Sequence, residues 1–296
     1  MTRYAAHKAF IAPAIPSAAP WRLIVGFLAA TAIYLLLNNL MFTTLFKLMG
    51  PRADGFYDSL LTGQTPMAML LLLGSFGLMI VGVAVVARLI HKRPVRGLMG
   101  PAHLVAPQFW AVLKILVLLG VVTYLLPPWD LGAPYVPNLA LGTWLLLLPF
   151  SLLGVLVQVS AEEIVFRGYV QQQLAARFSS PLVWMVLPAV IFALGHYLPD
   201  QAGENALVIA LWAGVFGMLM ADLTARAGSL GPAIAVHFCN NLAAIVITSM
   251  PDDLSGLALY LTPFGMNDTE ALRAWLPVDF ALMMVSWLAA RLAIRR

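Results

Sequence analysis

The stretch LALGTWLLLLPFSLLGVLVQVSAEEIVFRGYVQQQL, residues 139–174, decides the fold class of this chain. Residues 139–160 hold no charged side chain. As a helix they are long enough to cross the hydrocarbon core of a bilayer, which takes about 20 apolar residues. The apolar run then continues without a break into the polar sequence AEEIVFRG. Because ionisable side chains cost free energy inside a bilayer, we expect this helix to carry them for a functional reason.

The composition of the whole chain agrees with a membrane protein. Apolar residues make up 61% of the 296 residues and charged residues 10%, whereas soluble domains carry about 25% charged residues. With so few charged residues, the chain cannot form the surface of a water-soluble protein. We therefore predict an all-α membrane protein, a polytopic bundle of about eight transmembrane helices. The predicted spans lie at about 23–46, 66–90, 109–126, 139 onward, 182–197, 206–221, 230–250 and 276–290.

We expect one membrane domain in this chain. No soluble domain fits between the predicted spans and the sequence shows no internal repeat. Residues 21–296 are therefore predicted to form a single transmembrane domain, with the motif-bearing core at about 139–250. Residues 1–20 contain the proline-rich run IAPAIPSAAP without helical periodicity, and we predict that they form a flexible cytoplasmic tail.

The distribution of positive charge predicts the orientation and the partners. Lys and Arg gather in one set of segments between spans, such as HKRP at 91–94, and such segments stay in the cytoplasm. With eight spans, both termini of this multi-pass integral membrane protein then fall on the cytoplasmic side. We therefore attribute the net charge of +4 to basic residues that set the orientation in the membrane and contact the lipid bilayer. We expect no nucleic-acid partner. The single cysteine, Cys239, excludes an internal disulfide.

The first polar cluster is EEIVFR at 162–167. Glu163 and Arg167 are four residues apart, so they share a helix face and are predicted to form a supporting ion pair. Glu162 is rotated by about 100° from Glu163, and the same arginine neutralises it less directly. We expect Glu162 to point into a polar cavity, with Gln158 one turn before it on the same face. The alternative is that both glutamates only hold a buried structural network, as in many transporters.

Two further clusters place imidazoles in apolar spans. Phe192 and His196 share a face near the end of the fifth span, where the aromatic ring is expected to pack against the imidazole. His237 and Asn241 are likewise four residues apart in the seventh span, and together they offer hydrogen-bond donors to one oxygen. Polar side chains also hold membrane helices together, so a structural role for each cluster stays open.

Together the clusters supply the groups that hydrolysis of a peptide bond requires. A glutamate and a histidine can activate a water, and paired donors can stabilise the oxyanion of the tetrahedral intermediate. The sequence contains neither G-x-S-x-G nor H-E-x-x-H, so neither an α/β-hydrolase serine nor a soluble-type zinc protease is indicated.

At these residues the chain resembles the CAAX-protease and bacteriocin-processing (CPBP, also called Abi) family of intramembrane proteases. This family is related to the type II CAAX prenyl endopeptidase. The motif-bearing stretch covers about residues 139–250, and each motif is specific only in combination with the others. The three motifs, in order, are E-E-x-x-x-R as Glu162, Glu163 and Arg167, F-x-x-x-H as Phe192 and His196, and H-x-x-x-N as His237 and Asn241.

The resemblance implies an intramembrane endopeptidase and a role for each matching residue. It implies that Glu162 and His196 activate the water, and that His237 and Asn241 bind the oxyanion. Glu163, Arg167 and Phe192 would support that site. The substrate implied is a peptide or a membrane protein, lipidated ones included.

The cofactor is left open by the resemblance. Members of the family have been described as metalloproteases and as metal-independent enzymes with a glutamate-activated water. A zinc ion would take Glu162, His196 and His237 as its three protein ligands. Asn241 is easier to explain as an oxyanion donor than as a ligand, and we therefore favour an enzyme without an obligatory metal.

Functions of another class use the same polar residues. A non-catalytic membrane scaffold or immunity protein, or a transporter, would need them only for helix or ion contacts. A transporter often shows internal pseudo-symmetry, which this sequence lacks. Helix counting also places His237 and His196 at different depths. We expect Gly195 and Pro199 to end the fifth span early inside a cavity, which lets the two imidazoles converge.

Overall fold

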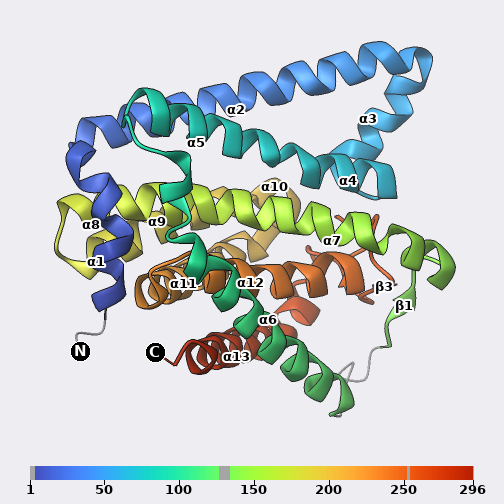
Figure 1. Cartoon of the computed structure of the whole chain (residues 1–296). Coiled ribbons are helices and arrows are strands. Elements are labelled where there is room, and N and C mark those ends of the chain that lie inside the picture. The colour runs from blue at the N-terminus through green and yellow to red at the C-terminus, as the bar shows by residue number, and fades with distance from the viewer. Residues whose placement is uncertain (1–3, 127–133, 252–253, 296) are drawn as a thin grey trace.

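The computed structural model of the protein describes residues 4–126, 134–251 and 254–295. The chain is 81% helical, which confirms the all-α prediction. The helices form three layers in Figure 1, with α2 to α5 above, α7 and α8 in the middle, and α6, α11, α12 and α13 below. The α-helices are α1 (Ala5–Ile11), α2 (Pro20–Met49), α3 (Ala53–Thr62), α4 (Pro66–Ser75), α5 (Gly77–Leu89), α6 (Ala102–Leu125), α7 (Leu141–Glu163), α8 (Gln172–Arg177), α9 (Pro181–Gly195), α10 (Pro199–Ala202), α11 (Ala206–Ala227), α12 (Gly231–Asn241) and α13 (Thr269–Ala293).

Shorter helical turns join these elements. Two of them, η4 (Ile164–Gln171) and η6 (Leu242–Ile247), are π-helical and continue α7 and α12 directly. The remaining turns are 3₁₀-helical, and they lie at η1 (Ala12–Ser17), η2 (Gly50–Arg52), η3 (Val95–Leu98) and η5 (Gly203–Asn205).

Within the described residues, six helical stretches are long and apolar enough to cross a membrane. Two shorter apolar stretches, Pro181–Gly195 and Gly231–Ile247, complete the set. Each of these segments overlaps one of the predicted spans, and six of them are long and apolar enough to cross a membrane. Their number and hydropathy indicate a multi-pass membrane protein. The six long stretches are Pro20–Thr62, Pro66–Leu89, Ala102–Leu125, Leu141–Arg177, Pro199–Ala227 and Thr269–Ala293.

The N-terminal segment differs from the expectation of a flexible tail over residues 1–20. Its described part is helical in α1 and η1. His7 and Phe10 are buried, and the His7 ring packs 4.5 Å from that of Trp184. The Tyr4 hydroxyl donates a hydrogen bond to Asp222 Oδ1 at 2.7 Å. The segment is ordered by contacts with residues far along the chain, which a local lack of periodicity does not reveal.

Small residues allow two pairs of helices to pack closely. A Cβ added at Gly82 in α5 would lie 2.7 Å from the Ala30 carbonyl oxygen in α2. A Cβ added at Gly217 in α11 would lie 3.2 Å from the Ala189 Cα in α9. Small residues commonly mediate such approaches in membrane helix packing, where close backbone contact replaces the hydrophobic driving force. The second approach brings α9 and α11 together beside the polar end of α7.

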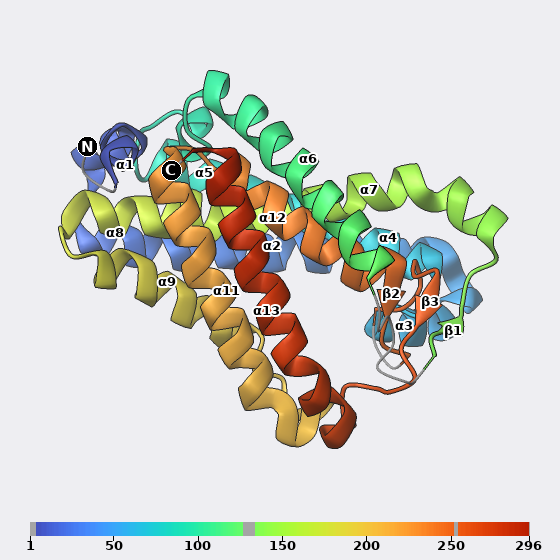
Figure 2. The ribbon, with the colours of Figure 1, turned by 90° about the horizontal axis from the view of Figure 1, so that it is seen from below.

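A three-stranded sheet of two-residue strands lies at one end of the bundle (Figure 2), with β1 (Val136–Pro137), β2 (Thr248–Ser249) and β3 (Tyr260–Leu261). β3 is central, antiparallel to β1 and parallel to β2. Just before β2, the carbonyl of Val246 accepts a hydrogen bond from Trp144 Nε1 at 2.8 Å. The sheet and this bond therefore tie the start of α7 to the end of η6.

Candidate active site

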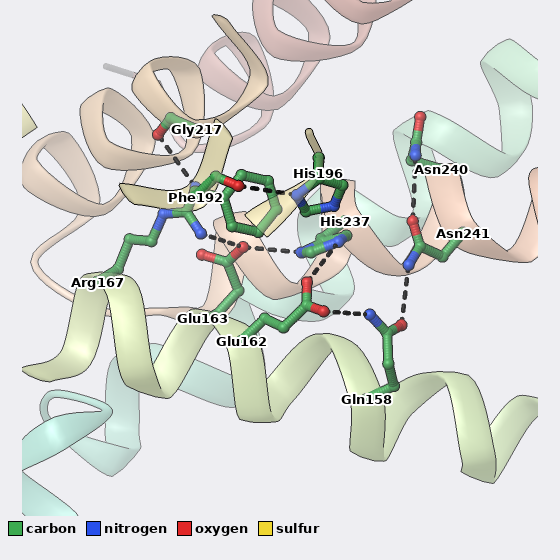
Figure 3. Close-up of polar contacts among 10 residues, drawn as sticks. All are labelled: Gln158, Glu162, Glu163, Arg167, Phe192, His196, Gly217, His237, Asn240 and Asn241. Carbon is green, nitrogen blue, oxygen red and sulfur yellow. Dashed lines mark hydrogen bonds and ion pairs between the residues drawn. The ribbon is translucent and has the colours of Figure 1, made fainter. Parts of the chain in front are cut away.

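The predicted site residues come from three elements that the fold brings together. Glu162 and Glu163 end α7, His196 follows the last residue of α9, and His237 lies within α12. Figure 3 shows these side chains converging between the ribbons, with Gln158 and Asn241 completing one side. Residues separated by as many as 83 positions thus form one polar cluster inside an otherwise apolar bundle.

The predicted ion pair between Glu163 and Arg167 is present. Arg167 Nη1 lies 3.1 Å from Glu163 Oε1, and the two side chains are 1% and 0% exposed. Arg167 Nη2 donates a second hydrogen bond, at 3.1 Å, to the carbonyl of Gly217. The guanidinium also packs 5.1 Å from the ring centroid of Phe192. This arginine therefore links α7, α9 and α11, which agrees with a supporting role.

His237 lies between the two glutamates. Its Nδ1 donates a hydrogen bond to Glu163 Oε1 at 2.8 Å, while its Nε2 lies 3.5 Å from Glu162 Oε2. Edge-to-face packing of Phe216, with centroids 5.0 Å apart, fixes the plane of the imidazole. Since Glu163 is already paired with Arg167, the imidazole is oriented by a carboxylate that is itself held in place.

Gln158 joins Glu162 to Asn241, which is a connection that the sequence did not indicate. Gln158 Nε2 donates to Glu162 Oε1 at 2.8 Å, and Asn241 Nδ2 donates to Gln158 Oε1 at 2.8 Å. Asn240 Nδ2 in turn donates to Asn241 Oδ1 at 3.1 Å. The only sequence signal for this chain was the one-turn spacing of Gln158 and Glu162. On an ideal helix the side chains of Asn240 and Asn241 point about 100° apart. The Asn240 side chain nevertheless contacts that of Asn241.

His196 borders the site through Phe192. Its Nδ1 donates a hydrogen bond to the Phe192 carbonyl at 2.8 Å, and the two rings pack with centroids 4.4 Å apart. The same phenylalanine ring lies 6.2 Å from that of His237. The α9 helix ends at Gly195, as expected, so the two imidazoles do converge on one aromatic side chain. His196 is half-buried, and its Nε2 has no hydrogen-bond partner among the residues that the structure describes.

Both π-helical segments begin directly after site residues. η4 follows Glu163 and η6 follows Asn241. π-helical turns occur frequently at functional sites because they shift the register of side chains relative to a regular α-helix. The periodicity of an α-helix does not predict these segments. The first of them, η4, carries Arg167 of the polar cluster, and the second follows Asn241 directly.

Two carboxylate oxygens of the cluster, Glu162 Oε2 and Glu163 Oε2, lack a hydrogen-bond partner among the described residues, and only the first belongs to a side chain that is not fully buried. Glu162 is 9% exposed, and its Oε2 has no hydrogen-bond partner within the described part of the chain, whereas its Oε1 is held by Gln158. A buried carboxylate oxygen without a donor is costly in a medium of low dielectric constant. Such an oxygen is a strong acceptor for the proton of a water molecule that enters the site.

The three-ligand zinc set that the resemblance permits is not assembled. Among the described residues, no group of three His, Cys, Asp or Glu side chains is arranged to hold a metal ion. His237 has a carboxylate at each ring nitrogen, and His196 reaches the cluster only through Phe192. The residues present therefore do not fit a zinc centre, and no step below passes through a metal.

An apolar cavity of about 210 Å³ lies beside the cluster, between α2, α5 and η4. Thr31 and Tyr34 line it from α2, and Val165 and Phe166 from η4. Tyr34 lies near Ser75 and close enough to Glu162 for the two groups to interact electrostatically. The cavity wall thus approaches the Glu162 carboxylate and is suited to an apolar group.

A family model matches the stretch of chain that builds this cluster. The model describes type II CAAX prenyl endopeptidase Rce1-like proteins, and it matches residues 143–243. Residues 143–243 are an Rce1-like domain. The Rce1-like family is a hydrolase family. The matched range contains the residues of all three motifs.

A curated relative extends the similarity beyond the Rce1-like domain. The uncharacterized protein YyaK of Bacillus subtilis (strain 168) is 25% identical over 246 residues. The alignment covers 79% of this chain and 80% of YyaK. No solved structure matches the chain. Because YyaK is itself uncharacterized, the similarity to it implies no activity.

Proposed function

We propose that the protein is an intramembrane endopeptidase that hydrolyses a peptide bond at the membrane. The supporting observation is the position of Glu162, a buried carboxylate held by Gln158 through one oxygen and free of hydrogen bonds at the other. A general base needs a free acceptor atom at the point where water enters. The Rce1-like domain supplies the reaction class, because that family consists of CAAX-type endopeptidases.

In the proposed reaction, Glu162 Oε2 accepts a proton from a water molecule as the water oxygen attacks the peptide carbonyl carbon. The carbonyl oxygen becomes an oxyanion in the tetrahedral intermediate. The C–N bond then breaks, and the proton held by Glu162 passes to the leaving amine. His196, whose Nε2 is free, assists in orienting the water.

His237 and Asn241 are the proposed oxyanion donors. Glu163 orients the ring of His237 through Nδ1–H. In the doubly protonated form that we propose, Nε2 also carries a proton, and this N–H faces the space beside Glu162, where it can donate to the oxyanion. Asn241 Nδ2 is now bonded to Gln158, and in this proposal it exchanges that acceptor for the oxyanion. Donors aimed at a developing charge stabilise the transition state more than the substrate.

The substrate we propose is a peptide or membrane protein that carries a lipid group. The apolar cavity beside Tyr34 can bury such a group within reach of Glu162, and the family description names prenyl substrates. Residues 21–296 are proposed to form one transmembrane domain of eight spans. Both termini would be cytoplasmic, which is supported by the basic segments at the ends of the spans.

The direct test is a cleavage assay on the full-length protein in lipid nanodiscs. We expect it to cut one bond, located by mass spectrometry, of an internally quenched peptide that ends in an S-farnesyl CAAX sequence. The same peptide without the farnesyl group should be cut less efficiently. Activity should also survive exhaustive chelation, because no three-ligand metal set is assembled among the described residues.

One outcome of this assay would contradict the metal-free mechanism, and another would contradict the enzyme proposal as a whole. Activity that is lost on chelation and restored by zinc would recast His196 and His237 as ligands. If the farnesylated peptide and a panel of unmodified membrane peptides all stay intact, the chain acts as a non-catalytic scaffold or a transporter and the enzyme proposal fails.

Replacing Asn241 tests the oxyanion assignment. We expect Asn241→Ala to lower kcat by about 10²–10³, which is the loss seen when one oxyanion donor is removed from a protease. KM should change far less, since the donor acts mainly in the transition state. Asn240 is no control because it contacts Asn241. Cys239→Ala, on the same helix and half-buried, should leave kcat unchanged, and an effect confined to KM in Asn241→Ala would contradict the assignment.

A further inference from the structure

One glutamine contacts both the proposed base and a proposed oxyanion donor. Gln158 lies in α7, one turn before Glu162, and it is 6% exposed. Its Nε2 donates a hydrogen bond to Glu162 Oε1, and its Oε1 accepts one from Asn241 Nδ2, each at 2.8 Å. Gln158 belongs to none of the three sequence motifs. Its amide nevertheless connects two groups of the proposed reaction, one in α7 and one in α12.

The carboxylate of Glu162 fixes the direction in which each amide of this chain points. As a general base Glu162 is ionised before the reaction, and an ionised carboxylate only accepts hydrogen bonds, so Gln158 has to present its Nε2. Oε1 of Gln158 is then left to accept from Asn241 Nδ2, and Asn241 Oδ1 accepts from Asn240 Nδ2. Turning Gln158 around would place oxygen against the carboxylate and nitrogen against Asn241 Nδ2. The orientation of Asn241 therefore depends on Glu162 through Gln158.

The same contact selects the oxygen of Glu162 that reacts. Oε1 is held by Gln158, whereas Oε2 has no hydrogen-bond partner among the described residues and lies 3.5 Å from His237 Nε2. A glutamate side chain has several rotatable bonds, so a carboxylate that is not held can turn away from the point where water attacks. A displacement of about 1 Å from the reacting geometry lowers a rate by on the order of 10². The hydrogen bond to Oε1 therefore bears directly on the proposed base.

We propose that Gln158 is a positioning residue of the endopeptidase, which sets the base and an oxyanion donor through one amide. This inference rests on the proposed function, since Glu162 and Asn241 have to carry the reaction for Gln158 to act through them. Gln158 itself contacts no reacting atom. It keeps Oε2 of Glu162 directed at the space beside His237, and it fixes which way the Asn241 amide faces.

The contact also links proton transfer to the release of Asn241. A hydrogen bond to an ionised group is roughly twice as strong as one between neutral groups. When Glu162 accepts the proton of the attacking water, the bond that it receives from Gln158 weakens. Gln158 then holds Asn241 less firmly, and Asn241 Nδ2 becomes available at the step in which the oxyanion forms.

Gln158→Met removes both hydrogen bonds while keeping a side chain of similar length. We expect it to lower kcat for the farnesylated peptide by about 10² and to change KM little, because both groups act mainly in the transition state. In an Asn241→Ala background the same change should lower kcat by a smaller factor, since members of one hydrogen-bonded network are not additive. Turnover in lipid nanodiscs measures both effects. The same factor in both backgrounds would overturn the proposal.

Gln108→Met is the matched control, because Gln108 in α6 uses both ends of its amide in the same way away from the cluster. Its Nε2 donates to the Ala227 carbonyl at 3.2 Å, and its Oε1 accepts from Ser229 Oγ at 2.6 Å. We expect Gln108→Met to leave kcat unchanged, and equal kcat values for the two methionine variants would contradict the role of Gln158. If Gln158→Met fails to fold, Gln158→Asn replaces it, because the shorter amide cannot reach both partners.

Infrared difference spectroscopy supplies a measurement that requires no turnover. The carboxylate stretching band of Glu162 is the band that Glu162→Gln lacks, and its frequency depends on the hydrogen bonds to the two oxygens. It should shift in Gln158→Met and stay in place in Gln108→Met. An unshifted band in Gln158→Met would overturn the positioning role even if the wild type cleaves the peptide. A shifted band in a protein that cleaves no peptide would confirm the contact but contradict the proposed function, and the positioning role with it.

Discussion

Glu162→Gln is expected to lower kcat by about 10²–10⁴, the range that a general base contributes, while the protein unfolds at nearly the same temperature. Glutamine has the shape of glutamate but no strong basic oxygen, so it cannot take the proton of the attacking water. Gln158 can still hydrogen-bond to the amide oxygen that replaces Oε1. The measurements are turnover of the farnesylated peptide and thermal unfolding in the same detergent.

Glu204→Gln is the matched control for this experiment. It makes the same chemical change at an exposed residue of η5, and it should alter neither kcat nor the unfolding temperature. A Glu162→Gln variant with wild-type turnover would exclude Glu162 as the base. A variant that loses turnover and stability together would instead indicate that Glu162 holds a structural network.

Arg167→Ala should destabilise the protein by about 3–5 kcal/mol, because it leaves the carboxylate of Glu163 buried without its charged partner. Arg167 and Glu163 are 1% and 0% exposed, and the guanidinium also bonds to the Gly217 carbonyl. Turnover should fall as well, since Glu163 orients His237. The free energy of unfolding can be followed by titration with a denaturing detergent.

Arg177→Ala serves as the control for the stability experiment. Arg177 is exposed at the end of α8, and substitutions at such surface positions usually change stability by less than about 0.5 kcal/mol. The double variant Arg167→Met/Glu163→Gln should recover part of the lost stability, because it removes the stranded charge. Equal unfolding free energies for Arg167→Ala and Arg177→Ala would show that the ion pair is not desolvated.

The eight apolar segments and the Glu163–Arg167 pair could be predicted because both depend on neighbouring residues. A run of apolar side chains favours a membrane helix whatever surrounds it. Residues four apart share a face in any α-helix, and this is why the 3.1 Å ion pair was foreseen. The three motifs also indicated the Rce1-like domain, since the matched range 143–243 contains all of them.

The contacts between helices were decided by tertiary structure. Gln158 joins Glu162 to Asn241 across 83 positions, and His237 is bonded to Glu163 across 74. No local pattern encodes such distances, because they depend on how closely α9, α11 and α12 pack around α7. The close approach at Gly217 and the register shift of η4 both contribute to that packing. The folding of α1 onto Trp184 has the same cause.

The sequence by itself thus determined which residues carry charge and polarity inside the membrane, and on which helix face each lies. Tertiary structure alone decided that Glu162 keeps one oxygen without a hydrogen bond while Gln158 donates to the other. The physical reason is that helix formation and membrane insertion are governed by local composition. A hydrogen-bonded cluster, in contrast, forms only where separate helices bring donors and acceptors within about 3 Å of each other.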